Sequence, residues 1–283
     1  MLRPLLLLAL ALPTGAVAAQ QRPVAGARAA PDAIVRLAGV RGPVTLMGWD
    51  RDSIALAGDA RGVTLAGPPA SLRVTGGDAT GGIELSVPRT ARIEIREGGS
   101  VDAIGLAGEL VVRVGEGRIR VEGALRRVEV EALEGAVELV GPIQAAVVRT
   151  AGGSVVVRGI RGELDVATTS GAIHVGAARV RRARLESVAG TVSFKGVVER
   201  AGSLDAQSHG DNVELRLPPD LAASFELGAP AGGIASAFGT VAAGATRARF
   251  TTGDGAAAIV ARSFKGRIEV LRQPNADLDL NAR

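Results

Sequence analysis

The sequence predicts an all-β protein built as a β-solenoid: a single-stranded, β-helix-like stack of about a dozen coils of 18–20 residues after a cleaved signal peptide. Three observations carry this prediction. A Gly-x-aliphatic-x-aliphatic-x-Gly segment recurs through the middle of the chain. Each segment follows a run in which apolar residues alternate with polar ones. No stretch has the apolar period of an internal helix.

Five segments share the glycine pattern, the fourth in a shortened form. Their first glycines follow one another at steps of 18, 18, 18 and 19 residues: Gly117, Gly135, Gly153, Gly171 and Gly190. Each unit therefore contains two short strands. Small residues lie three positions before most of these glycines and mark a corner: Ala132, Thr150, Thr168, Ser187 and Ser208. Glycine at a corner permits positive φ and close approach of two backbones.

Stacked coils would align equivalent residues in columns and so bury an apolar face that one coil cannot bury alone. One inner column is predicted to comprise Ile119, Val137, Val155, Ile173, Val192 and Val213. Its neighbour is predicted to comprise Val121, Leu139, Val157, Val175, Phe194 and Leu215. A sandwich or barrel is the alternative, because its short strands also alternate at regular intervals.

Further copies extend the repeat toward both ends; the one at Gly42 is clean, and those at Gly232 and Gly266 are weaker. Upstream they begin at Gly99, Gly81, Arg61 and Gly42, and downstream at Asp211, Gly232 and Gly266. We therefore predict one repeat domain over residues 32–272 and a C-terminal tail over residues 273–283.

The N-terminus has the pattern of an export signal. Residues 1–19 combine a basic start, a short apolar run and a small-residue cleavage site, which is typical of a secretory signal peptide. An uncleaved membrane anchor is the alternative, although the apolar run is short for a bilayer. Residues 20–31 are predicted to be a flexible leader. No later stretch is long enough to span a membrane, so the mature chain should be periplasmic or extracellular.

The composition excludes several function classes. The chain has no cysteine, which excludes disulfides, thiolate metal sites and a cysteine nucleophile. It has two histidines, His174 and His209, so a three-histidine metal site is impossible. Lys and Arg number 33 against 29 Asp and Glu, an excess too small for a dedicated nucleic-acid binder. We predict no cofactor and no nucleic-acid partner.

Four segments together resemble a known family. They are Thr-Thr-Ser-Gly-Ala-Ile at 168–173, Leu-Arg-Leu-Pro-Pro-Asp at 215–220, Gly-Asp-Gly at 253–255 with Ser-Phe-Lys-Gly-Arg-Ile-Glu-Val at 263–270, and Val-Thr-Leu-Met-Gly-Trp-Asp at 44–50. Over residues 32–272 the chain resembles the bacterial toast-rack family of β-strand-repeat proteins, also called "putative adhesin", whose function is unknown. The resemblance implies a β-helix-like rack, a cell-envelope setting and no catalytic residues. Some members occur in envelope-stress systems.

Two groups of residues suggest catalysis at first sight. Ser208, His209 and Asp211 are the residue types of a hydrolase triad, but they are nearly consecutive at one corner and cannot converge from different directions. The outward carboxylates Glu129, Glu131, Asp165, Glu186 and Asp205 would suit sugar chemistry. Arginines are interspersed among them, which favours neutralising rows along the stack. We therefore predict no catalytic and no metal site; lone His174 is an outer-face residue.

The most basic stretch is the candidate binding site. Arg179, Arg181, Arg182 and Arg184 would contact anionic envelope polymers or lipid head groups. The leading hypothesis is an exported, non-enzymatic, adhesin-like envelope scaffold. A polysaccharide-active β-helix enzyme and a sensory or regulatory component of envelope-stress signalling, with an envelope protein as partner, remain alternatives. An uncapped end of a solenoid would also permit self-association.

Overall fold

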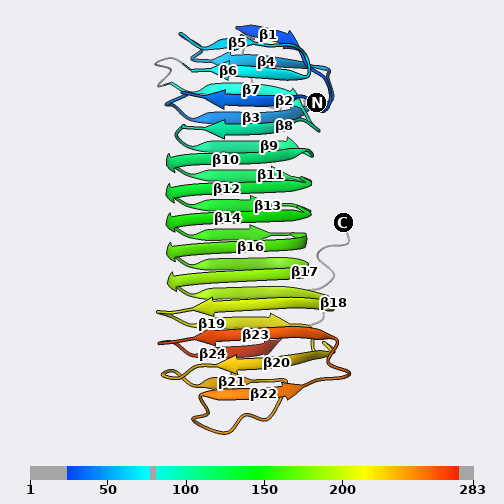
Figure 1. The fold of residues 1–283 in the computed structure, drawn as a ribbon, viewed down its shortest axis with the longest axis vertical. Coiled ribbons are helices and arrows are strands. Elements are labelled where there is room, and N and C mark those ends of the chain that lie inside the picture. Colours follow the sequence, from blue (N-terminus) through cyan, green and yellow to red (C-terminus); the bar gives the residue numbers. More distant parts are fainter. Residues whose placement is uncertain (1–23, 77–80, 274–283) are drawn as a thin grey trace, which may run out of the picture.

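The computed structural model describes residues 24–76 and 81–273, which consist of 24 strands joined by turns and loops (Figure 1). This confirms the predicted all-β class. Within the described part of the chain, there is accordingly no helix long and apolar enough to cross a membrane. The predicted signal peptide, residues 1–19, lies outside the described residues. Residues 274–283 of the predicted tail also lie outside them.

The strands form two ladders that run the length of the stack and share one apolar core. From the N-terminal end, the first ladder contains β5 (Thr64–Ala66), β6 (Ser71–Thr75), β2 (Ile34–Ala38), β8 (Arg92–Arg96), β10 (Glu109–Glu116), β12 (Arg127–Glu134), β14 (Ala145–Gly152), β16 (Arg161–Ser170), the later parts of β17 (Ile173–Ala189) and β18 (Val192–Ser208), β23 (Ala257–Ser263), β20 (Ala223–Gly228) and β22 (Arg247–Thr251).

The second ladder packs its inward side chains against those of the first. In the same direction it contains β1 (Ala25–Arg28), β4 (Ser53–Gly58), β7 (Ile83–Pro88), β3 (Val44–Trp49), β9 (Val101–Leu106), β11 (Ile119–Gly123), β13 (Val137–Val140), β15 (Val155–Arg158), the early parts of β17 and β18, β19 (Val213–Leu217), β24 (Ile268–Arg272) and β21 (Ile234–Ser236).

Consecutive coils in the middle of the stack pair in parallel register. Ile119 pairs with Val137, Val137 with Val155, and Val155 with Ile173. These pairings confirm the 18-residue step. Both predicted inner columns are buried, since no member has more than 3% of its surface exposed. Burying an aliphatic side chain of this size stabilises the fold by about 1.5–3 kcal/mol before conformational entropy is subtracted.

At the N-terminal end, the order of the coils in space differs from their order in the chain. β2 lies between β6 and β8, and β3 lies between β7 and β9. The copy that begins at Gly42 therefore separates the copies of Gly81 and Gly99, which the repeat step predicts to be neighbours. The residues after Arg61 form β5, which runs antiparallel to β6 and is not a further parallel coil.

The C-terminal end shows the same exchange of order. β23 lies between β18 and β20, and β24 lies between β19 and β21. The copy that begins at Gly266 is therefore stacked directly on the coil of Asp211, and the copy of Gly232 lies outside it. β22 follows as an antiparallel strand on β20.

The exchange has a physical reason, because a stack that ended on a parallel coil would leave an open edge and an uncovered core. Near the C-terminus the chain instead continues to the end of the stack and turns back. Its last coil, β23 and β24, is then inserted next to β18 and β19. Antiparallel strands end both ladders at the N-terminal end, where they are β1, β4 and β5, and the first ladder at the C-terminal end, where it is β22; the second ladder ends there on the parallel strand β21. β1 pairs with β4, and Ala29 is 2% exposed, which differs from the flexible leader expected over residues 20–31.

Glycine is required where the coils turn. Gly153 has a φ of 102°, and a Cβ built there would lie 2.2 Å from the carbonyl oxygen of Gly135. Gly135 and Gly171 meet the preceding glycine in the same way, at 2.0 and 2.1 Å. No other residue type fits a backbone approach this close, so the glycines hold the spacing of the coils.

We expect Gly153→Ala to lower the free energy of unfolding by about 1–3 kcal/mol, because the methyl group clashes and the backbone is strained. Gly176→Ala is the matched control, since its φ is not positive and no heavy atom lies within 4 Å of the added Cβ. Urea denaturation of both variants measures the difference. Equal midpoints would contradict a tight corner.

Candidate functional site

Ser208, His209 and Asp211 share one corner but are bonded to other partners. Ser208 Oγ donates a hydrogen bond to the carbonyl oxygen of Gly190 at 2.9 Å and accepts one from the backbone N–H of Asp211 at 3.0 Å. The ring of His209 stacks on Phe264, with centroids 4.8 Å apart. A triad needs the imidazole between serine and carboxylate, so this corner has the geometry of a structural turn.

The bond made by Ser208 recurs along the corner. Ser187 Oγ donates to the carbonyl oxygen of Gly171 at 2.9 Å, and Ser263 Oγ donates to that of Asp211 at 2.7 Å. Thr168 occupies the position of Ser187 in the preceding coil. Its buried Oγ1 has no hydrogen-bond partner among the described residues. Hydrogen bonds from these hydroxyls therefore link adjacent coils at three of these corners.

We expect Ser208→Ala to destabilise the protein by about 1 kcal/mol, because it removes two hydrogen bonds at a part-buried corner. Thr168→Val should change stability by less than about 0.5 kcal/mol or raise it, since the hydroxyl it removes is unsatisfied. Chemical denaturation compares the two. A larger loss for Thr168→Val than for Ser208→Ala would contradict this assignment.

The four arginines of the predicted anion contact lie along the first-ladder part of β17, and two are already neutralised. Arg181 pairs with Glu163 at 2.9 Å, and Arg184 pairs with Glu186 at 2.7 Å. The hydrogen bonds that Arg184 donates to Glu186, together with the charge of that carboxylate, raise the pKa of Arg184 above its ordinary value. Arg179 and Arg182 are exposed and make no ion pair within residues 24–76 and 81–273. The available charge therefore comes from two residues.

Every carboxylate considered for sugar chemistry is held by an arginine. Arg113 binds both Glu129 and Glu131, at 3.0 and 2.9 Å. The remaining pairs are Arg149–Asp165 at 2.5 Å, Arg184–Glu186 at 2.7 Å and Arg262–Asp205 at 3.9 Å. These pairs are the neutralising rows that the sequence suggests.

His174 is exposed on the second ladder, where its register neighbours are Val156 and Ser193. Neither neighbour is a good metal ligand. Throughout the described ranges, no three His, Asp or Glu side chains gather in a way that could hold a metal ion.

A row of outward side chains along one corner was not recognised in the sequence. These residues follow the buried small residues of successive coils, and we term them the corner row: Leu133, Ala151, Thr169, Val188, His209 and Phe264. Leu133, Val188 and Phe264 are 65%, 53% and 55% exposed. Apolar side chains exposed together at one edge are a feature of binding surfaces.

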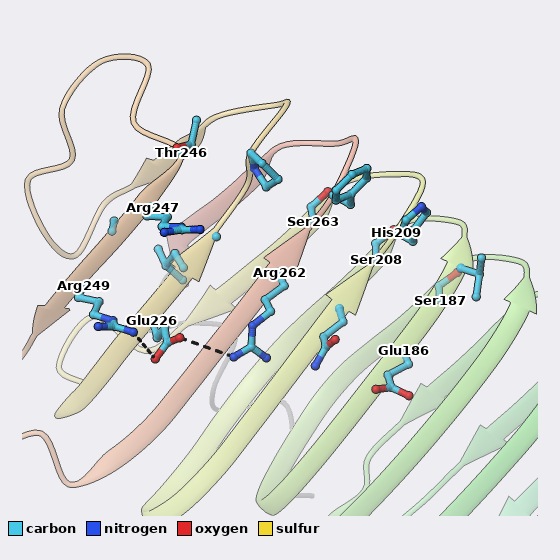
Figure 2. Close-up of a pocket in the computed structure, with 17 residues that line it drawn as sticks. Glu186, Ser187, Ser208, His209, Glu226, Thr246, Arg247, Arg249, Arg262 and Ser263 are labelled. Carbon is cyan, nitrogen blue, oxygen red and sulfur yellow. Dashed lines mark ion pairs between the residues drawn. The ribbon is translucent and has the colours of Figure 1, made fainter.

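Two hollows adjoin the corner row on the first ladder. The C-terminal groove has a volume of about 810 Å³ and crosses β17, β18, β23, β20 and β22 (Figure 2). The middle groove, of about 670 Å³, lies over β10 to β17 and shares Glu186 and Val188 with the first. Both volumes are within the usual range of ligand sites.

The C-terminal groove contains an ion-pair network and one separate cation. Glu226 lies between Arg249 and Arg262, with N–O distances of 3.4 and 3.6 Å (Figure 2). Arg247 is exposed on β22 and forms no ion pair with any residue that the structure describes. The sequence signal for this groove was weak, because Phe264 reaches His209 only through the insertion of β23 beside β18.

No protein-family model and no curated protein matches the sequence. Among solved structures, the chain is similar to a "putative adhesin" from Bacteroides fragilis, with 11% identity over 87% of this chain and 95% of that chain and a TM-score of 0.43. It is also similar to a "putative lipid binding protein" and a "putative adhesin" from Parabacteroides distasonis. The "putative lipid binding protein" has 10% identity over 87% of this chain and 95% of that chain, with a TM-score of 0.42. The "putative adhesin" from Parabacteroides distasonis has 12% identity over 89% of this chain and 98% of that chain, with a TM-score of 0.36. Because these TM-scores are below 0.5, the similarity identifies no function for this chain.

Proposed function

We propose that the chain is an exported, non-catalytic, adhesin-like binding protein, a β-solenoid that makes its contacts along its sides. The observation that supports this function is the parallel 18-residue register, which repeats one outward position in every coil. Such a row presents side chains at steps of about 4.8 Å. A rigid row can engage an extended polymer at several weak sites at once, which raises the overall affinity.

The surroundings of the candidate catalytic groups support a binding role. The hydroxyl of Ser208 is engaged at a corner, and the outward carboxylates are paired with arginines. Neither arrangement leaves a hydroxyl or a carboxylate free for nucleophilic attack. Export is supported by the signal-peptide pattern of residues 1–19.

We propose anionic polymers of the cell envelope as the partner. Arg179 and Arg182 carry exposed guanidinium groups without ion-pair partners in the described structure, so a bound anion displaces no carboxylate. Binding at Arg181 or Arg184 would first have to break the pairs with Glu163 or Glu186. The proposed contact therefore comprises two arginines, and not the four that the sequence suggests.

The test is co-sedimentation of the exported chain with isolated envelope fractions at low and high salt. We expect pelleting at low salt that is lost at high salt, because exposed charges are screened. Arg179→Gln/Arg182→Gln should weaken apparent binding by at least about fivefold, equivalent to about 1 kcal/mol. Arg181→Gln/Arg184→Gln removes the same charge from arginines that are already paired, and should weaken it less.

Two outcomes would overturn the proposed contact. Equal losses in both double variants would show that local net charge matters and the unpaired arginines do not. No pelleting of the unmodified chain at either salt would exclude envelope polymers and direct the search to a protein partner by crosslinking.

A further inference from the structure

One of the arginines that line the C-terminal groove forms no ion pair with any residue that the structure describes. Its lining carries three arginines and two glutamates. Glu226 is shared by Arg249 and Arg262, and Glu186 is paired with Arg184 outside the lining. Arg247 is left over. A ligand with a single anionic group would complement this charge without disturbing the network.

The wall of the groove along the corner row presents few free hydrogen-bonding groups. Ser187, Ser208 and Ser263 line it, but each hydroxyl donates to a carbonyl at the corner. The amide of Gln207 donates to Asp205 at 2.9 Å. The lining also includes Val188, the stacked pair of His209 and Phe264, and Pro230. The wall is therefore suited to an apolar group.

A gap in the outward side chains forms the bottom of the groove. Gly228 pairs with Arg262 on one side and Arg247 on the other, so it occupies a position where both neighbours carry long side chains. A Cβ placed at Gly228 would meet no heavy atom within 4 Å, and its φ is not positive. The backbone does not require glycine here, and the missing side chain leaves open space.

The groove favours an alkyl chain over a peptide or a sugar. The five strands below it pair with one another across the groove and leave only the outer edge of β22 without a described partner, so a peptide lying across the groove would meet no free ladder edge. A buried peptide or sugar would leave polar groups unsatisfied at a cost of about 1–3 kcal/mol each. An alkyl chain has no such groups. Its length can follow the groove across five strands, about 19 Å.

We propose that the C-terminal groove binds a single-chain amphiphile with one anionic head group. Arg247 binds the head, and the chain lies over Gly228 against Val188, Phe264 and Pro230. This site lies at the other end of the β17 strand from Arg179 and Arg182, and it does not depend on the binding of envelope polymers. The inference therefore goes beyond the proposed function.

Isothermal titration calorimetry with dodecanoate, below its micellar concentration, tests the site directly. We expect one molecule to bind per chain. Dodecyltrimethylammonium has the same chain and a cationic head, and acetate has the same head without the chain. Both should bind at least tenfold more weakly than dodecanoate, because the site needs the anion and the chain together.

Two groove variants and two matched controls locate the binding. Arg247→Gln should weaken dodecanoate binding about tenfold or more, since it removes a charge-assisted contact. Gly228→Leu should abolish binding by filling the groove. Arg73→Gln makes the same charge change at an exposed arginine on β6, outside both proposed sites, and Gly176→Leu makes the same size change at a glycine with open space. Both controls should bind as the unmodified chain does, and urea denaturation verifies that all four variants fold.

Three results would overturn the proposal. They are no binding of dodecanoate to the unmodified chain, equal affinity for dodecyltrimethylammonium, and unchanged affinity in both folded groove variants. None of these results affects salt-dependent pelleting with envelope fractions, so failure of the groove and failure of the envelope contact are distinguishable.

Discussion

The structure depends on how closely the backbone of one coil approaches the next at the glycine corner. There the position of a Cβ at Gly153 falls 2.2 Å from the carbonyl oxygen of Gly135. This contact keeps the parallel register, and the register keeps like residues in line. A slip of one residue would exchange inward and outward side chains in a whole strand. The buried columns, the rows of ion pairs and the corner row all follow from the same alignment.

The middle of the stack could be predicted from the sequence because its pattern is strict. Each coil between Gly117 and Gly190 has one neighbour in the chain on either side, and that neighbour carries the same glycine and the same alternation. The ends could not be predicted in this way. The copies at Gly42 and Gly266 fit against any coil, so the repeat does not specify which one they join. Packing between distant segments decides the order.

The candidate site was predicted only in part, for a related reason. The basic stretch was visible as a run of arginines, but whether each is available depends on its neighbours across the ladder. Glu163 neutralises Arg181 from the preceding strand, and Glu186 neutralises Arg184 from its own strand. The groove depends on still more distant neighbours. Gly228 and Arg247 line the same groove as Phe264 because β23 inserts beside β20.

The inserted coils also determine the order in which the molecule can assemble. Central coils pair residues 18 apart, as Val137 does with Val155, whereas β18 and β23 pair Leu204 with Ile259. Closing a longer loop costs more conformational entropy and slows the step that needs it. The centre should therefore fold first and the two ends last. The C-terminal groove then exists only in the fully folded chain, because three of its five strands, β23, β20 and β22, join the ladder with the insertion. Partial unfolding from this end would remove the groove and leave the central ladders paired.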